Sequence, residues 1–101
     1  MLSEPIVVIV SRDLEDLLPL FMQQRKADQA AIAAAVAAAD FAALRRVGHG
    51  MVGSGASYGF DALSSLGERF VSAARAGDLS AIGALQREFD DYLSRLVVKF
   101  L

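Results

Sequence analysis

The segment from Arg45 to Phe60, RRVGHGMVGSGASYGF, contains the side chain best suited to chemistry, because it holds His49, the only histidine of the chain. A neutral imidazole has a free lone pair on one ring nitrogen and can act as a nucleophile near neutral pH. Four glycines lie in the helical pattern around this histidine, namely Gly48, Gly50, Gly53 and Gly55. An interior glycine costs a helix roughly 1 kcal/mol relative to alanine, so packing or function must explain so many of them.

Helical spacing predicts that His49 faces solvent. Apolar residues recur on the opposite face of the same helix, namely Phe41, Leu44, Val47, Met51 and Tyr58. Gly53 lies one turn after His49 on the same face, where the missing side chain leaves room for a covalent group on the ring or for a partner protein. A lone histidine is also compatible with a solvated or capping side chain, and the spacing alone leaves both interpretations open.

The segment resembles the signature of histidine-containing phosphotransfer (HPt) domains. In that family a solvent-facing histidine on a bundle helix is followed by glycine four residues later, then by a small residue, and later by another glycine. The matching residues here are His49, Gly53, Ser54 and Gly59, and the run SYGFDALSSLG continues as the next helix does in that family. The resemblance covers about residues 13–96. It implies that His49 reversibly accepts a phosphoryl group, at Nε2, from the aspartate of a receiver domain and passes it to another.

One residue departs from the family pattern. Many HPt domains carry a lysine three residues after the histidine, where this chain has Val52. The resemblance assigns that lysine a positive charge near the phosphoryl group, so its absence bears on how the phosphoryl group is stabilised. Arg45 and Arg46 precede His49 by one turn and could supply this charge, with a solvated helix face as the alternative.

Small residues around Gly53 are expected to form a flat patch for the receiver and the phosphoryl group. Gly50 and Ala56 would widen this patch. Ser54 would donate a hydrogen bond to the phosphoryl group or to the ring, and a small packing residue is the alternative interpretation. A hydrolytic pair of Ser54 with His49 is excluded, because side chains five positions apart diverge around a helix.

The chain offers no cofactor site of its own. One histidine without cysteine removes the usual zinc constellations, and no glycine-rich loop follows a strand to hold a nucleotide. Phosphoryl transfer depends on a metal ion and positioned cations. The resemblance therefore implies that Mg²⁺ and the catalytic groups belong to the partner, a receiver domain of a response regulator or a hybrid histidine kinase. The chain would be a relay intermediate and not a kinase.

Two other functions remain open. A bundle that binds receiver domains without carrying phosphate is suggested by Val52 in place of lysine. A helical scaffold or dimerisation module with an incidental histidine is suggested by the alanine-rich run at residues 30–39, whose small side chains permit close helix packing.

Composition limits the class of protein. We expect one domain over residues 1–101, and an all-α fold because alanine and leucine dominate and there are only 2 prolines. The net charge of −2 provides no basic surface for nucleic acid. We see no secretion signal and no apolar run of the roughly 20 residues that a membrane span needs, so we expect a cytoplasmic protein without membrane partners. A monomer is expected, because one bundle accounts for most apolar residues.

The pattern predicts an antiparallel up-down four-helix bundle over about residues 13–96, with a short β ribbon joining the two ends of the chain. The β-branched run at residues 6–10, IVVIV, follows a proline, and residues 96–100, LVVKF, are similar, so both are expected to be extended and to pair. Ser11 or Asp13 should cap the first helix. Pro19 predicts either a bend or a short helix that leads into a longer one.

Aspartates and glycines predict the other helix boundaries. The expected caps are Asp40, Asp61 and Asp78 at helix starts, with Gly59 and Gly77 at helix ends. The last helix carries the clearest apolar stripe, Ile82, Leu85, Phe89, Tyr92 and Leu96. Within the first helix, Arg25 and Asp28 are expected to form an exposed ion pair. A break there, with Asp28 capping a second helix, is the alternative.

Overall fold

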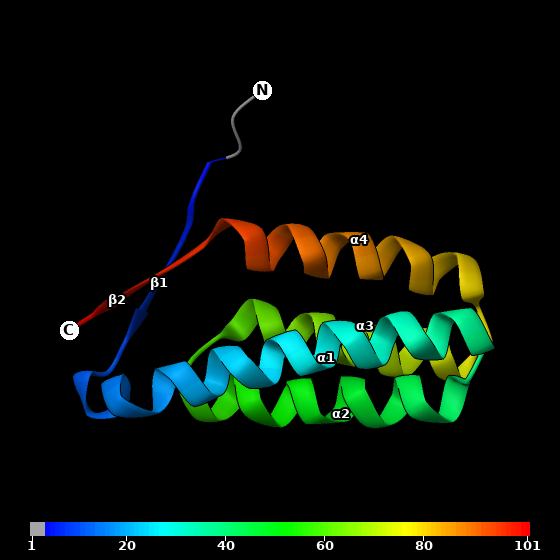
Figure 1. Cartoon of the computed structure of the whole chain (residues 1–101), viewed down its shortest axis with the longest axis horizontal. Coiled ribbons are helices and arrows are strands. Elements are labelled where there is room, and N and C mark those ends of the chain that lie inside the picture. Colours follow the sequence, from blue (N-terminus) through cyan, green and yellow to red (C-terminus); the bar gives the residue numbers. More distant parts are fainter. Residues whose placement is uncertain (1–3) are drawn as a thin grey trace.

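Four helices and two terminal strands make up the chain in a computed structural model, which describes residues 4–101 (Figure 1). The elements in chain order are β1 (Ile6–Val10), the 3-10 helix η1 (Arg12–Leu17), α1 (Leu18–Ala38), α2 (Phe41–Tyr58), α3 (Asp61–Arg75), α4 (Leu79–Arg95) and β2 (Leu96–Phe100). The predicted all-α bundle with a terminal β ribbon is confirmed. Within residues 4–101, no helix combines the length and apolarity needed to cross a membrane.

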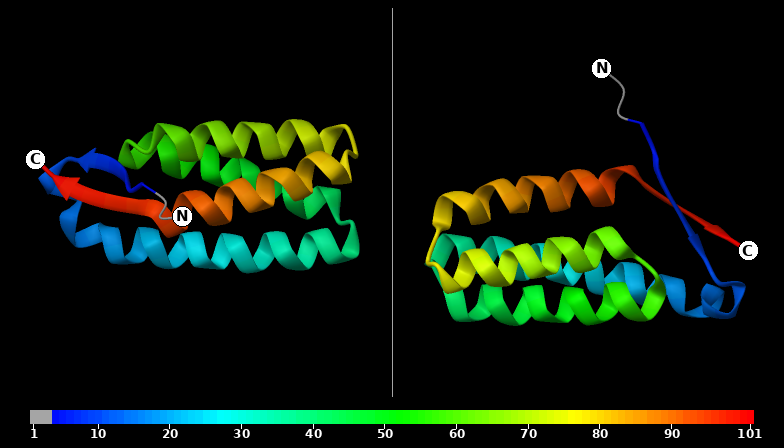
Figure 2. Two further views of the ribbon diagram at one scale, coloured as in Figure 1. Left: turned by 90° about the horizontal axis from the view of Figure 1, so that it is seen from above. Right: turned by 180° about the vertical axis from the view of Figure 1, so that it is seen from behind.

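The helices pack so that α1 and α3 each lie between α2 and α4 (Figure 2). Only Ala39 and Asp40 separate α1 from α2, and only Gly59 and Phe60 separate α2 from α3. Connections this short make successive helices antiparallel neighbours. Pro19 lies in the first turn of α1, after η1, so the predicted short helix before a longer one is the arrangement found.

Most predicted helix boundaries are confirmed. The carboxylates of Asp40 and Asp78 accept hydrogen bonds from the amides of Ala43 and Ala81, each at 3.0 Å. Gly59 and Gly77 have positive φ, +82° and +63°, in the left-handed region that glycine enters at little cost.

Two boundary predictions are wrong by one residue. Phe60 occupies the N-cap position of α3 and makes no side-chain cap bond, so Asp61 is the first helical residue and not the cap. Its carboxylate still lies in the first turn, where the helix dipole favours negative charge. Leu96 is the first residue of β2 and not the last of α4, because its backbone is already extended.

The core is formed by the apolar faces of all four helices, as the spacing predicts for α3 and α4. Its most buried side chains include Ile32, Leu44, Met51, Leu63, Leu66, Phe70, Ile82 and Phe89. The rings of Phe70 and Phe89 meet edge to face at 6.4 Å between centroids, a favourable aromatic geometry. This contact ties α3 to α4.

The terminal strands run parallel, and their register pairs Ile6 with Leu96 and Val10 with Phe100. Side chains alternate between a face packed on the bundle and an exposed face. Two arginines hold the ribbon in place: Arg95 Nε donates to the carbonyl oxygen of Glu4 at 2.8 Å, and Arg12 Nε donates to that of Leu101 at 2.7 Å.

The predicted exposed ion pair in α1 is wrong about exposure. Arg25 and Asp28 pair at 2.8 Å between Nε and Oδ2, but their residues are only 2% and 7% exposed. Both side chains lie between α1 and α2, and the guanidinium covers the ring of Phe21 at 4.7 Å from its centroid. Helix α1 continues through Asp28, so the alternative of a break is also wrong.

Close packing of α2 on α3 explains two of the four glycines around His49. A Cβ atom on Gly48 would lie 2.8 Å from the carbonyl oxygen of Gly67, and one on Gly67 would lie 2.5 Å from that of Gly48. Gly55 likewise packs against Ser64 at the other end of the interface. Backbone atoms cannot move aside cheaply, so these positions require glycine for the two helices to approach.

We expect Gly67→Ala to lower the free energy of unfolding by about 1–3 kcal/mol, as overpacking of a rigid interface does. Gly53→Ala is the matched control, because a Cβ atom there would meet no atom within 4 Å. That control should raise stability by roughly 0.5–1 kcal/mol through helix propensity. Urea unfolding followed by circular dichroism measures both, and effects of the same sign would contradict the packing role of Gly67.

Candidate functional site

His49 lies on the exposed face of α2, between Gly48 and Gly50 in the sequence. The helix is continuous there despite Gly50 and Gly53, and a Cβ atom on either would meet nothing within 4 Å. Neither glycine therefore contributes a side chain to the surface beside His49, and the space above both positions is open.

A shallow cavity of about 280 Å³ lies on the other side of His49, between α2 and α3. Its lining residues are Ala42, Arg45, Arg46, His49, Val71 and Arg75. The structure therefore brings both predicted arginines to the same cavity as the histidine. Among residues 4–101, no carboxylate lies within ion-pair distance of the guanidinium groups of Arg45, Arg46 or Arg75. The guanidinium groups around the imidazole thus form no ion pair with a carboxylate of the described residues.

Arg75 was not predicted as a site residue. It lies in the last turn of α3, 26 positions after His49 in the sequence, and no local motif connects the two. The antiparallel packing of α2 on α3 places the end of α3 beside the first half of α2, where Arg45 also lies. The short connection at residues 59–60 is the sequence signal that could have indicated this neighbourhood.

Val52 and Ala56 lie at the α3 side of the patch. Val52 is half-buried, and its carbonyl oxygen accepts a hydrogen bond from Ser64 Oγ at 2.9 Å. Ala56 is exposed and has a small side chain, so the surface beyond Gly53 stays flat. All three members of the predicted small-residue patch, Gly50, Gly53 and Ala56, are exposed, and docking of a receiver on this patch stays a prediction.

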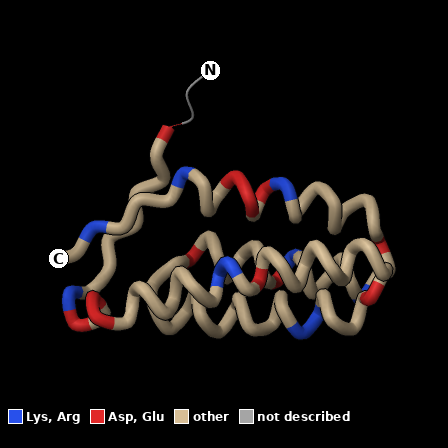
Figure 3. The backbone as a smooth tube through the Cα atoms, viewed as in Figure 1, with Lys and Arg blue, Asp and Glu red and all other residues tan. Residues whose placement is uncertain are grey.

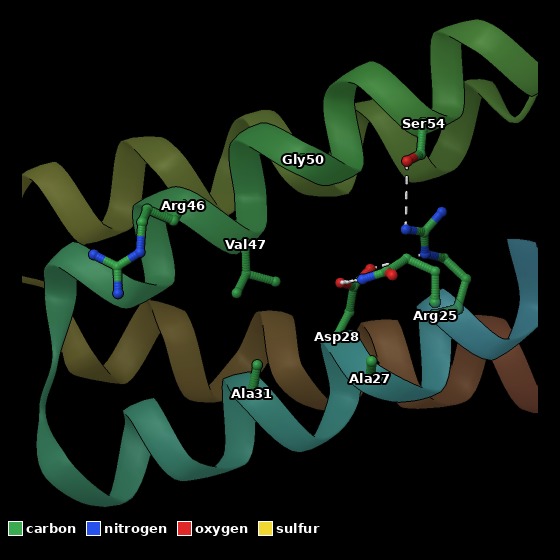
Figure 4. A pocket seen from close by; sticks show the side chains of 9 residues that line it. Arg25, Ala27, Asp28, Ala31, Arg46, Val47, Gly50 and Ser54 are labelled. Atoms are coloured by element: carbon green, nitrogen blue, oxygen red, sulfur yellow. Dashed lines mark hydrogen bonds and ion pairs between the residues drawn. The ribbon is translucent and has the colours of Figure 1, made fainter.

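Ser54 lies apart from His49 and shares a groove with two other predicted site residues, Arg46 and Gly50. Its hydroxyl accepts a hydrogen bond from Arg25 Nη2 at 3.4 Å, in a groove of about 600 Å³ between α1 and α2 (Figure 4). His49 does not line this groove. Within residues 4–101 no hydrogen bond joins Ser54 to the ring, and its hydroxyl contacts Arg25 instead. A hydrogen bond from Ser54 to a phosphoryl group stays a prediction. Arg46 lines both the groove and the cavity at His49.

Across residues 4–101, no three histidine, cysteine, aspartate or glutamate side chains are grouped closely enough to hold a metal ion. The chemistry available at the site is that of one exposed imidazole with arginines on one side and a small-residue surface on the other.

The comparison with protein families gives one match. The family model described as the Hpt domain matches residues 16–98, which include all four α-helices from Leu18 onward. No curated protein and no solved structure matches the chain.

Proposed function

This chain belongs to the Hpt domain family, which has a histidine phosphotransfer role in two-component phosphorelays, and we propose from this that His49 is its phosphoacceptor. The observation that best supports this proposal is that the chain has a single histidine and that this histidine is exposed on α2. A phosphotransfer histidine must meet the aspartate of its partner, so it cannot be buried. Proteins of this family carry phosphoryl groups and are not catalysts in general.

The proposed reaction is an in-line transfer between two proteins. The lone pair of His49 Nε2 attacks the phosphorus of a receiver aspartyl phosphate, the N–P bond forms as the P–O bond breaks, and the aspartate carboxylate leaves. The reverse reaction passes the group to another receiver. In this proposal the receiver domain, of a response regulator or a hybrid histidine kinase, holds Mg²⁺ and supplies the other catalytic groups.

The arginines beside His49 are proposed to stabilise the charge of the phosphoryl group. Many proteins of the family use a lysine at the position of Val52, which is half-buried here and uncharged. Arg45, Arg46 and Arg75 provide positive charge from the adjoining cavity instead. Charge that is already in place when the transition state forms is the largest common source of catalysis in such transfers.

Replacing Arg75 by glutamine should slow phosphoryl transfer about three- to tenfold, because one of the positioned cations is lost. Arg87→Gln is the matched control, since Arg87 is an exposed arginine of α4 outside the cavity. Single-turnover transfer from a phosphorylated receiver measures the rate for both variants. Equal rates for the Arg75 variant and the wild type would leave Arg75 without a part in the reaction.

The experiment that tests the function uses wild-type protein and a panel of phosphorylated receiver domains with Mg²⁺. We expect label on the chain that is acid-labile and base-stable, as phosphohistidine is. Receiver binding without label would instead support the phosphorylation-independent binding module that Val52 suggests. Neither binding nor label with any receiver would contradict both functions.

A further inference from the structure

The outer edge of β1 has free backbone groups. The carbonyl oxygen of Val10 accepts a hydrogen bond from the amide of Leu101 at 3.1 Å, so the backbone groups of Val10 point toward β2. In a parallel pair, alternate residues direct both backbone groups to the same side. Ile6 and Val8 therefore also bond to β2, while Val7 and Ile9 direct their N–H and C=O groups to the outer edge. The sheet has only two strands among residues 4–101, and no hydrogen bond within them reaches these outward groups.

This edge also lacks the features that normally protect an edge strand. Natural edges carry a lysine, a proline or a bulge that prevents pairing with another chain. No charged residue lies in β1, whose sequence is IVVIV, and the tube along this strand is tan in Figure 3. The side chains of Val7 and Ile9 are apolar, and these residues are 49% and 62% exposed. A further strand would give the outward backbone groups of β1 hydrogen-bond partners and would therefore stabilise the sheet.

We propose that two copies of this chain pair through β1, antiparallel across a two-fold axis at Val8, to form a continuous sheet in the order β2, β1, β1, β2. Two identical edges related by a two-fold axis meet antiparallel, and the same residues contribute from both sides. This register places Val7 opposite Ile9 of the second copy. Every outward backbone group of Val7 and Ile9 then has a partner, and Pro5, which has no N–H, stops the pairing at its end.

The residues that flank β1 favour a second copy of this chain as its partner. Glu4 precedes the strand and Arg12 is the first charged residue after it. The two-fold axis brings Glu4 of one copy toward Arg12 of the other, so opposite charges lie at both ends of the paired strands. Arg12 also lies 3.8 Å from Glu15 in an exposed ion pair of its own chain, and Glu4 would share its guanidinium with Glu15. Apolar β-branched pairs such as Val7 with Ile9 add roughly 0.2–1 kcal/mol each.

The sequence suggested a monomer because one bundle accounted for most apolar residues. The ribbon lies at the end of the bundle (Figure 2), and its exposed face carries Val7, Ile9 and Val97 together with Lys99, which the register places opposite Ile9. An interface of a few strand residues is well below the roughly 1,200 Å² of a stable complex, so we expect a weak dimer that forms with rising concentration.

Sedimentation equilibrium from micromolar to millimolar concentration tests the proposal with two matched lysine variants. Ile9 and Leu20 are both 62% exposed, but Leu20 lies in α1 outside the ribbon. We expect the wild type and Leu20→Lys to dimerise and Ile9→Lys to stay monomeric with unchanged helical content. A wild type that is monomeric throughout, or equal association of the two variants, would overturn the proposal.

Disulfide cross-linking tests the register, since the chain has no cysteine of its own. Opposed residues of an antiparallel pair are about 5.5 Å apart between Cα atoms, within the range of a disulfide. A mixture of Val7→Cys and Ile9→Cys proteins should form mainly the mixed disulfide on oxidation. Faster cross-linking of either variant with itself would contradict the two-fold axis at Val8, and a partner strand from another protein would leave all three samples uncross-linked.

Discussion

Replacing His49 by glutamine should abolish acid-labile phosphorylation by every receiver that labels the wild type. Glutamine keeps much of the size and polarity of histidine but has no ring nitrogen with a free lone pair, so no N–P bond can form. Because the chain has no second histidine, no neighbouring imidazole can substitute. The measurement is the amount of label after incubation with phosphorylated receiver and Mg²⁺.

The loss of phosphorylation should come from the missing nucleophile and not from unfolding of the protein. His49 is exposed, and no side-chain hydrogen bond or ion pair joins it to other residues within 4–101, so the substitution should change the free energy of unfolding by less than about 0.5 kcal/mol. Receiver binding by His49→Gln and His49→Ala should persist if docking uses the small-residue patch of Gly50, Gly53 and Ala56. Label that remains on the glutamine variant would show that another residue is the acceptor.

Replacing Asp28 by alanine should destabilise the fold by about 3–5 kcal/mol, because it leaves the buried guanidinium of Arg25 without its carboxylate. Arg25 Nη1 already has no hydrogen-bond partner, and among residues 4–101 only Ser54, at 3.4 Å, would still accept a hydrogen bond from this guanidinium. Alanine has the higher helix propensity, so the loss cannot be attributed to the helix itself. Urea unfolding followed by circular dichroism measures the change.

An exposed ion pair of similar geometry provides the control. Arg95 and Asp91 pair at 3.0 Å on α4, with side chains 31% and 53% exposed, so Asp91→Ala should cost only about 0–1 kcal/mol. A double variant, Arg25→Met with Asp28→Leu, should recover most of the loss, since it removes both buried charges together. If Asp28→Ala costs no more than Asp91→Ala, the pair in α1 is solvated and its burial is contradicted.

The sequence predicted the helices and most of their caps because these depend on local chemistry. Asp40, Gly59 and Asp78 act within one turn of their own positions, and a stripe such as that of α4 is visible without knowing its neighbours. The burial of Arg25 could not be predicted in the same way, because charge type favours exposure and the covering residues come from α2. Likewise, spacing alone does not distinguish Gly48, which packs on α3, from Gly53, which faces open space.

For the candidate site, the residues that lie on one helix could be predicted from the sequence, but those contributed by a second helix could not. His49 and the preceding arginines lie on one helix, so helical periodicity was enough to group them. Arg75 reaches the cavity only through the packing of α3 on α2, which the order of residues along one helix does not contain. The separation of Ser54 from His49 is local, because side chains five positions apart diverge around a helix, and only the contact of Ser54 with Arg25 depends on where α1 lies.

The parallel pairing of β1 with β2 has a consequence for the order of folding. The hydrogen bond from Arg95 to Glu4 joins residues 91 positions apart, whereas α2 and α3 meet through a short connection. Closing a long loop costs more entropy than closing a short one, so local helix hairpins form early and the ribbon forms last. The ribbon should also open first, which would release both ends of the chain while the four helices stay packed. The outward edge of β1 is held in place for pairing only after the ribbon has formed. Association of two copies would therefore show that folding is complete.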